Sequence, residues 1–209
     1  MRLYLITGDR GDEVETLRIV EAALEGGANV IQLRKKSMPM LEQYRLALAL
    51  RILTREHEVL LIVNDHADLA IAADADGVHL GQEDLPPDAV RSLPGFGGRL
   101  IGRSTHSLEQ ARAAIAEGAD YFAVGPVYPT PTKAGRPAVG TALVSEVAAI
   151  ADRPFLAVGG IDHDNAPDVI EAGAGAVAVV RAVYDAADPA EAARRLHEMI
   201  TTRLEVANR

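Results

Sequence analysis

The sequence of 209 residues contains no cysteine, which excludes disulfide bonds, thiolate metal sites and cysteine nucleophiles. It also lacks an excess of basic residues, because 21 Lys and Arg face 30 Asp and Glu and the formal net charge is -9. So acidic a chain has no broad basic face for a phosphate backbone, and we expect no nucleic-acid partner. No stretch is long and apolar enough to cross a bilayer, so we expect no membrane association. The absence of cysteine fits a reducing compartment, and we expect a cytoplasmic protein.

The composition that is present is typical of a globular protein. Hydrophobic residues make up 48% of the sequence, enough for a full core, and charged residues make up 24%, which argues against disorder. Neither a low-complexity segment nor a linker divides the chain. We therefore expect one domain that spans residues 1–209.

Short apolar runs rich in Val, Ile and Leu recur along the whole chain. Their near-continuous apolarity is typical of strands that are buried on both faces. The predicted strands are Leu3–Thr7, Val30–Arg34, Leu60–Asn64, Gly77–Gly81, Leu100–Ser104, Tyr121–Gly125, Phe155–Gly159 and Ala176–Arg181.

Helical patterns lie between these runs. The predicted helices are Asp12–Glu25, Met40–Glu56, Ala67–Ala73, Pro86–Ser92, Ser107–Glu117, Thr141–Ala151, His163–Ala172 and Pro189–Val206. Ser107 followed by Gln110 forms a capping-box pattern at one helix start. Apolar residues at helical spacing predict the buried stripes of the first two helices, which are Val14, Leu17, Val20 and Leu24, and then Leu41, Tyr44, Leu48 and Ile52.

The alternation of strand and helix, eight times over, predicts parallel strands joined by helical crossovers. Eight such units in 209 residues match the smallest closed (β/α)8 TIM barrel. A doubly wound open sheet is the alternative architecture. We therefore predict an α/β fold, with a single compact (β/α)8 barrel as the favoured form.

Charged residues follow several of the predicted strands, at the end of the barrel where catalytic groups lie in this fold. The cationic ones are Arg34, Lys36, Lys133 and Arg181, and the anionic ones are Asp65 and Asp84. An acidic protein that gathers bases at one rim is expected to bind an anion there. Two carboxylates beside those bases would repel a polyphosphate unless a cation lay between them, and Mg²⁺ prefers such a set of ligands. The pattern favours a pyrophosphate as leaving group.

The segment from Pro126 to Gly140 is longer than most connections from a strand to the next helix. It holds Thr130, Thr132 and Lys133, and this composition predicts a lid that closes over a phosphate. Gly159-Gly160 and the end of the eighth strand offer backbone N–H groups where barrels often hold a phosphate.

Each of these features also has a simpler structural interpretation. Asp65 and Asp84 precede predicted helices and fit N-caps. The polar residues of Gln32–Lys36 fit a solvated strand end. His79 lies inside a strand and fits a hydrogen-bonded core histidine, whereas His106 fits either a cap or a proton-transfer role. The simpler interpretations do not explain why all these residues occur at one end of one barrel.

The motifs together resemble the thiamine-phosphate synthase family, within the superfamily that it forms with thiazole tautomerase. The matching strings extend from the first strand to the last, and those at Gly77–Asp84 and Pro129–Lys133 are the most specific. The others include Gln32-Leu33-Arg34 with Lys36, Asn64-Asp65, Ser104–Ser107, Gly125-Pro126 and Gly159-Gly160-Ile161.

The resemblance implies a reaction and a cofactor. The family transfers a 4-amino-2-methylpyrimidin-5-ylmethyl group from its pyrophosphate to a thiazole phosphate, giving thiamine phosphate and pyrophosphate. The implied mechanism is dissociative, so that positioning and electrostatic stabilisation replace a side-chain nucleophile. Mg²⁺ is the implied cofactor, with Asp65 and Asp84 as its ligands. The partners are therefore the two small-molecule substrates, and the sequence leaves the oligomeric state open, a homo-oligomer included.

The resemblance also implies which residues bind the substrates. Arg34, Lys36, Ser104 and Lys133 are the implied catalytic residues. The implied pyrimidine pyrophosphate site is Gln32, Leu33, Arg34, Lys35, Lys36, Asn64, Ser104 and Lys133. The implied thiazole phosphate site is Thr130, Pro131, Thr132, Gly160, Val180 and Arg181.

The sequence departs from the family pattern at three positions. Lys35 stands where the family often has Glu, Arg103 where a small or apolar residue is usual, and Arg181 where a phosphate-contacting Ser is usual. Arg181 matters most, because it either adds a charge-assisted contact to the phosphate or points away and leaves only backbone contacts.

Three other functions fit the same fold. A thiazole tautomerase would use His106 for proton transfer and would need no metal-pyrophosphate site. A non-catalytic phosphate-ligand binding barrel would keep the pocket without turnover. A sugar-phosphate isomerase or epimerase is a third alternative, because the fold alone does not distinguish these activities.

Overall fold

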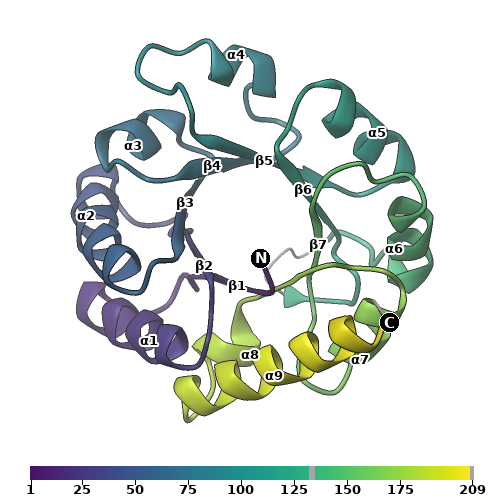
Figure 1. The fold of residues 1–209 in the computed structure, drawn as a ribbon. Helices are drawn as coiled ribbons and strands as arrows, with labels where there is room; N and C mark the ends of the chain where they lie inside the picture. The colour runs from purple at the N-terminus through teal and green to yellow at the C-terminus, as the bar shows by residue number, and fades with distance from the viewer. Residues whose placement is uncertain (132–134, 208–209) are drawn as a thin grey trace.

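A computed structural model describes residues 1–131 and 135–207 and confirms the predicted barrel. Eight parallel strands close on themselves (Figure 1). They are β1 (Leu3–Ile6), β2 (Val30–Leu33), β3 (Leu60–Asn64), β4 (Gly77–Leu80), β5 (Leu100–Thr105), β6 (Tyr121–Val124), β7 (Phe155–Val158) and β8 (Val177–Val179). Because β1 pairs with β8 as well as with β2, the sheet has no edge, which excludes the doubly wound open sheet.

The helices surround the barrel in the order that the sequence predicts. They are α1 (Glu13–Glu25), α2 (Met40–Glu56), α3 (Ala67–Ala72), α4 (Pro87–Arg91), α5 (Leu108–Ala116), α6 (Gly140–Ala148), α7 (Ala166–Glu171), α8 (Arg181–Tyr184) and α9 (Pro189–Ala207). The side chain of Ser107 accepts the N–H of Gln110 at 3.2 Å, which confirms the predicted cap of α5. In turn, Gln110 Oε1 accepts the N–H of His106 at 2.8 Å.

The short helix α8 is the element that the sequence analysis missed. The last apolar run was predicted as one strand up to Arg181, whereas β8 ends at Val179 and Arg181 is the first residue of α8. The pairing of β8 with β1 reaches only Val179, so Val180, although apolar, has no partner residue on β1 and does not extend the strand. This correction places Arg181 at a helix start beside the barrel opening.

The apolarity of the strands reflects two separate cores. The outward side chains, such as Leu5, Ile31 and Val63, pack beneath the helices. The inward ones fill the barrel, and they are Tyr4, Val30, Ile62, Tyr121, Ala123, Leu156, Ala176 and Ala178. Successive residues of a strand point to opposite faces, so both cores draw on the same short runs.

The predicted buried stripe of α2 is wrong at three of its four positions, with only Tyr44 packed against the core, and one position in α1 is wrong too. The residues that the structure exposes are Val14, Leu41, Leu48 and Ile52, at 75%, 60%, 40% and 61% of their surface. The buried face of α2 instead carries Leu46, Ala47 and Leu50. It also carries Arg51, whose Nη1 lies 2.6 Å from Asp76 Oδ2. Because α2 has apolar residues on two sides, periodicity alone could not select the face that packs on the barrel.

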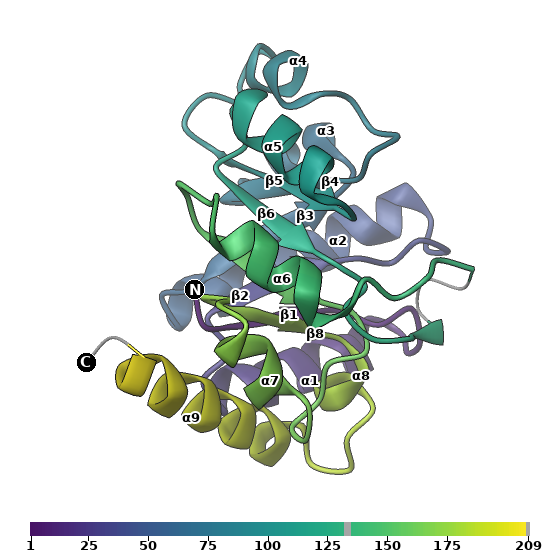
Figure 2. The same ribbon diagram turned by 90° about the vertical axis from the view of Figure 1, so that its right-hand side faces the viewer.

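The chain's N-terminus lies at one end of the barrel, and the long connection from β6 to α6 lies at the other. In the side view of Figure 2 the N-terminus lies on the left, and the connection from β6 to α6 extends to the right-hand edge. The carboxyl ends of the strands and the polar residues that follow them lie on the side of this connection. In the part of the chain that the structure describes, no helix has both the length and the apolarity that a membrane span requires.

Candidate active site

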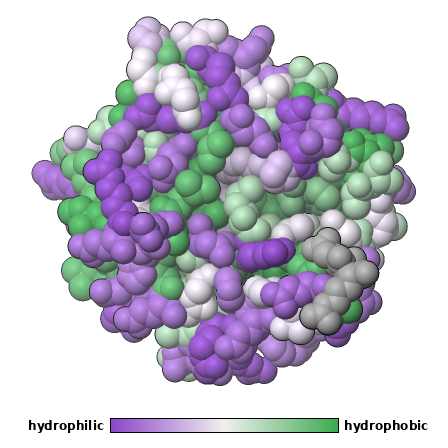
Figure 3. Space-filling view, viewed as in Figure 1, coloured by the Kyte–Doolittle hydropathy of each residue, from purple (hydrophilic) through white to green (hydrophobic). Residues whose placement is uncertain are grey.

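A cavity of about 350 Å³ opens at the carboxyl ends of the strands. The cavity lies on the side of the barrel turned away from the viewer in Figure 1. The space-filling view of Figure 3 shows the opposite end, at the amino ends of the strands, where hydrophilic residues surround a centre of apolar and weakly polar ones. The polar residues that line the cavity are Tyr4, Gln32, Arg34, Asn64, His79, Ser104, Thr130, Asp162, Arg181 and Asp185. The structure therefore brings together most of the predicted site residues that it describes.

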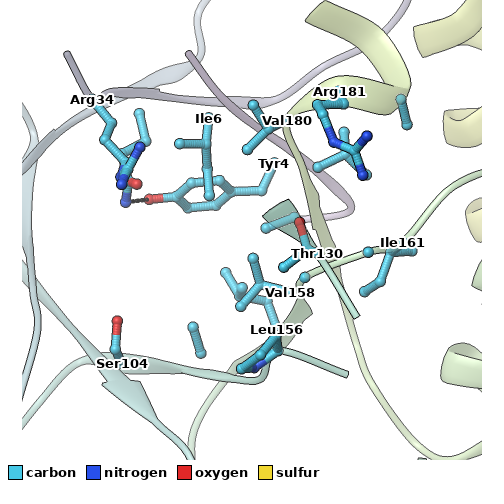
Figure 4. Close-up of a pocket in the computed structure, with 18 of the residues that line it drawn as sticks. Tyr4, Ile6, Arg34, Ser104, Thr130, Leu156, Val158, Ile161, Val180 and Arg181 are labelled. Atoms are coloured by element: carbon cyan, nitrogen blue, oxygen red, sulfur yellow. Dashed lines mark hydrogen bonds between the residues drawn. The ribbon is translucent and has the colours of Figure 1, made fainter. Parts of the chain in front are cut away.

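The cavity has two polar ends and an apolar middle (Figure 4). Arg34 and Ser104 lie on one side of the view, whereas Arg181 and Thr130 lie on the other. Between them the wall is formed by Leu156, Val158, Ile6 and Ala123 and by the ring of Tyr4. This arrangement suits a pair of ligands that meet in the middle and carry their charge at opposite ends.

Arg34 is held at its end of the cavity by a carboxylate that the sequence analysis did not select. Asp9 Oδ2 lies 3.2 Å from Arg34 Nη1, and Asp9 Oδ1 accepts the backbone N–H of Lys36 at 2.9 Å. One side chain thus organises both cationic residues of this strand end. Asp9 follows the first predicted strand, as the other selected residues follow theirs, and this position was the signal that could have identified it.

A smaller cavity of about 150 Å³ adjoins the first and shares Arg34 and Asn64 with it. It is also lined by Lys36 and Asp65, whose Nζ and Oδ2 atoms lie 3.5 Å apart. The predicted pyrophosphate residues of β2 and β3 therefore lie together, with cations and a carboxylate around one small space.

Asp65 and Asp84 form a carboxylate pair and do not cap helices. The helices α3 and α4 have His66 and Pro86 at their N-caps, so the N-cap interpretation is wrong. Burial, and then the neighbouring Asp84 carboxylate, raise the pKa of Asp65, whereas the Lys36 ammonium lowers it. Asp84 Oδ2 also accepts the N–H of Gly81 at 2.6 Å.

The backbone of Asp65 adopts a left-handed conformation, with φ of 64°. Such a conformation is uncommon for a residue with a side chain, and it persists only where the surroundings hold it. Here the Asp65 N–H donates to the carbonyl of His79 at 2.9 Å, which ties the end of β3 to β4. The strained turn directs the Asp65 carboxylate toward the smaller cavity that it lines.

The donor set fits Mg²⁺ better than a metal held by protein ligands alone. Within residues 1–131 and 135–207, no group of three or more His, Asp and Glu side chains is arranged to hold an ion. Mg²⁺ is commonly bound by one or two carboxylates, with phosphate oxygens and waters as its remaining ligands. The pair of Asp65 and Asp84 beside a cationic pocket matches that requirement.

A buried chain of hydrogen bonds crosses the floor of the larger cavity. Gln32 Nε2 donates to the Tyr4 hydroxyl at 2.8 Å, and the Tyr4 and Tyr121 hydroxyls lie 3.0 Å apart. His79 joins Tyr121 to Ser104, with Nδ1 3.2 Å from the phenol and Nε2 3.0 Å from the Ser104 hydroxyl. The interpretation of His79 as a hydrogen-bonded core histidine is thus confirmed, and the structure adds that His79 lines the cavity, which the sequence analysis did not predict.

Two residues of the predicted pyrimidine pyrophosphate site point out of it. Leu33 is 1% exposed and packs in the outer core, so no side-chain contact with a substrate remains for it. Lys35 is 3% exposed, and its Nζ donates to the carbonyls of Arg10 and Gly11 and to the Tyr184 hydroxyl at 2.6, 3.2 and 3.1 Å. The predicted side-chain contacts of Leu33 and Lys35 with the substrate are therefore wrong, although Lys35 still belongs to the lining of the smaller cavity. Alternation along β2 turns these two outward and their neighbours inward.

At the other end of the cavity, two glycines pack beneath the start of the predicted lid. Gly159 and Gly160 have φ of 99° and 67°, which favours glycine. A Cβ on Gly160 would lie 2.7 Å from Tyr128 Cβ and 2.8 Å from the carbonyl oxygen of Pro129. The backbone N–H of Tyr128 donates to the carbonyl of Gly159 at 3.0 Å. The glycines thus allow a close approach that brings this segment over the cavity.

The predicted residues of the thiazole phosphate site, together with Lys133 of the pyrimidine pyrophosphate site, divide into three groups. Thr130, Gly160, Val180 and Arg181 line the cavity. Pro131 is exposed and does not line it. Thr132 and Lys133 lie outside the described residues.

Arg181 lies at the cavity and does not point away from it (Figure 4). No carboxylate among the described residues pairs with its guanidinium, although the Asp185 carboxylate, one turn along, pairs with Arg10 at 2.7 Å. The contrast with the paired Arg34 leaves Arg181 available to an anionic ligand.

His106 and Arg103 both serve the framework. The His106 Nδ1 is hydrogen-bonded to the carbonyl of Gly125, and His106 lines neither cavity. Arg103 is 6% exposed, and its Nη1 donates to the carbonyl of Gly81 at 2.6 Å. The Arg103 side chain thus holds the segment that follows β4 in place and does not line the cavity.

Comparison with known proteins agrees with this geometry. The family model described as thiamine monophosphate synthase matches residues 3–183. A thiamine-phosphate synthase of Mycolicibacterium vanbaalenii is 46% identical over 209 residues, covering 95% of this chain and 94% of its own. One from Acidothermus cellulolyticus is 49% identical over 194 residues, covering 92% and 91%.

Solved structures show the same similarity. The thiamine phosphate pyrophosphorylase of Pyrococcus furiosus superposes with a TM-score of 0.88 at 37% identity, covering 97% of this chain and 96% of its own. A 3-hexulose-6-phosphate synthase superposes with a TM-score of 0.72 at 20% identity, covering 96% and 100%, and this likeness concerns the fold alone.

Proposed function

Because the chain belongs to the thiamine monophosphate synthase family and is a transferase of thiamine biosynthesis, we propose that it joins a pyrimidinylmethyl pyrophosphate to a thiazole phosphate, giving thiamine phosphate and pyrophosphate. The observation that carries the proposal is the cavity with one cationic group at each end, Arg34 and Arg181, and an apolar middle. Each substrate brings an anionic group and a ring, so the two anions bind at the ends and the rings meet between them.

The first step is departure of the pyrophosphate from the methylene carbon of the pyrimidine. Arg34 and Lys36 bind the departing oxygens, and Asp9 holds both residues in place. At a separation near 4 Å and an effective dielectric constant near 20, one unit charge pair is worth about 4 kcal/mol. The electron-rich aminopyrimidine stabilises the methylene cation that remains. No side-chain nucleophile is required for this step.

The second step is capture of the cation by the thiazole nitrogen. Leu156 and Val158 line the middle of the cavity and leave little room for water beside the cation. Thr130, Gly160 and Arg181 bind the phosphate of the thiazole and direct its nitrogen toward the methylene carbon. Catalysis in this scheme rests on positioning and on electrostatic stabilisation of the leaving group.

Asp65 and Asp84 are the residues that would hold Mg²⁺. When bound, Mg²⁺ supplies positive charge to the leaving pyrophosphate. The support for this assignment is that Asp65 lines the smaller cavity beside Lys36, that the Asp84 carboxylate is a close neighbour of Asp65, and that neither residue caps a helix.

An assay of the purified chain with both substrates, with and without Mg²⁺, tests the proposal. We expect thiamine phosphate and pyrophosphate to form in equal amounts with Mg²⁺, and turnover to stop in excess chelator. Isomerisation of a thiazole phosphate without any coupling would establish the tautomerase instead. Binding of both substrates without product would establish a non-catalytic barrel.

A further inference from the structure

The hydrogen-bonded chain on the cavity floor links five strands through five buried side chains. Gln32, Tyr4, Tyr121, His79 and Ser104 are 2%, 1%, 2%, 7% and 8% exposed. Gln32 and Ser104 stand at the two ends and line the cavity together with Tyr4 and His79, whereas Tyr121 does not line it. Tyr121 can therefore affect a ligand only through its neighbours.

The strand β5 is built to let this chain form. A Cβ on Gly102 would overlap the ring and hydroxyl of Tyr121 and would lie 2.5 Å from His79 Nδ1. Glycine inside a strand forgoes side-chain packing and commonly marks a close approach of other groups. Here it makes room for the contact between Tyr121 and His79.

Only one order of protons leaves no buried hydrogen within the chain without an acceptor, apart from the hydroxyl proton of Ser104 at its end. The amide of Gln32 donates from Nε2, so the Tyr4 oxygen accepts at that side. Tyr4 then donates to Tyr121, and Tyr121 donates to His79 Nδ1. In the opposite order the Tyr4 oxygen would accept from both sides, and its own buried proton would have no acceptor within the chain.

The consequence of this order appears at Ser104. If Nδ1 of His79 accepts, the neutral ring carries its proton on Nε2 and donates it to the Ser104 oxygen. The proton of the Ser104 hydroxyl is then directed toward the cavity. At the opposite end the Gln32 amide, having donated from Nε2, presents its carbonyl oxygen as an acceptor.

We propose that Tyr121 is a positioning residue for the transfer reaction, because it sets the Nε2–H tautomer of His79 and thereby makes Ser104 a hydrogen-bond donor to the substrate. This inference rests on the proposed function for the identity of the ligand. The departing pyrophosphate gains negative charge and accepts hydrogen bonds, so a donor at the Arg34 end of the cavity stabilises it. The Gln32 oxygen complements the amino group of the pyrimidine.

The test uses the full chain with ¹⁵N-labelled histidine, observed by NMR without ligand, and the same protein in steady-state kinetics. In the wild type we expect the His79 ring, assigned by its loss in His79→Asn, to show the Nε2–H pattern. In Tyr121→Phe we expect a mixture of tautomers, with kcat about tenfold lower and KM for the thiazole phosphate unchanged. Tyr184→Phe is the matched control, because it also removes a buried hydroxyl but takes no part in the hydrogen-bonded chain of the cavity floor. Its His79 signals should equal those of the wild type.

A wild-type His79 that carries its proton on Nδ1, or a Tyr121→Phe protein with unchanged tautomer or unchanged kcat, would overturn the proposal. If Tyr121→Phe fails to fold, Tyr4→Phe replaces it, since it removes the hydroxyl that donates to Tyr121. The His79 tautomer then decides alone, because Tyr4 itself lines the cavity, and an unchanged tautomer overturns the proposal. The spectra are recorded without substrate, so they are independent of the proposed function. Failure of that function would appear separately, as absence of thiamine phosphate from the wild-type reaction.

Discussion

The two ends of the cavity differ in how their charges are held. At one end Arg34 is paired with Asp9 and Lys36 with Asp65, on strand ends that neighbouring strands fix in place. At the other end Arg181 has no carboxylate partner among the described residues and begins a helix of four residues. The first end is organised for chemistry, where charge changes during the reaction and must be met without rearrangement. The second end needs only to bind a phosphate whose charge stays the same.

The largest effect should follow loss of the carboxylate pair at the organised end. We expect the double variant Asp65→Ala and Asp84→Ala to lose roughly a thousandfold in kcat, because one charge pair of about 4 kcal/mol corresponds to that factor. Steady-state kinetics across Mg²⁺ concentrations measures the loss, and circular dichroism checks the fold. Asp88→Ala, an exposed substitution on α4, is the control that should retain activity. A double variant with full activity would remove the metal role.

A smaller loss should follow removal of the carboxylate that organises Arg34. We expect Asp9→Ala to lower kcat about tenfold, which is the scale of one charge-assisted hydrogen bond at a half-exposed site. Asp9→Asn keeps an acceptor for the Lys36 N–H, so it should lose less. Equal losses in the two variants would mean that the charge of Asp9 matters and its geometry does not.

At the other end we expect a change in binding and little change in turnover. Arg181→Ser should raise KM for the thiazole phosphate about fivefold and leave kcat nearly constant, because an exposed cation contributes modest uniform binding. The difference between wild type and variant should shrink in high salt. A fall in kcat with KM unchanged would show that this end also takes part in the chemistry, and the contrast between the ends would fail.

The smallest effect concerns Lys35, which lies beside the organised end but supports the loop after β1. Burial lowers its pKa from the ordinary value of 10.5. The unfolded chain therefore binds more protons than the folded chain between the lowered pKa and 10.5, and in that range folding stability rises with pH. We expect the stability of the wild type relative to Lys35→Met to increase between neutral and alkaline pH, as measured by urea unfolding. A difference that stays constant would show that Lys35 titrates alike in both states.

The strand order and the clustering of charges could be predicted because both depend on local pattern. The apolar runs and the turn residues between them define strands and helices, and parallel strands carry their carboxyl ends to one side. That reasoning alone placed Arg34, Lys36, Asp65 and Arg181 at one rim. It failed for Val14, because helical spacing does not say how far a helix end extends beyond the core.

Other features depend on contacts between distant segments. Asp9 reaches Arg34 across 25 positions, and Tyr4 reaches Tyr121 across 117 positions. Neither pair has a spacing that sequence could reveal. Lys35 was misassigned for a related reason, since its partners come from the loop after β1 and from Tyr184 of α8.

The sequence by itself determined the eight-unit barrel, the family and the charged character of the rim, because periodic burial and local motifs act over a few residues. Only the tertiary structure decided which of those charges meet, which are diverted into the framework, and that a chain of buried hydroxyls and one imidazole joins Gln32 to Ser104. Hydrogen bonds and ion pairs act over about 3–4 Å, so their partners are set by the closure of the barrel and not by the order of the chain.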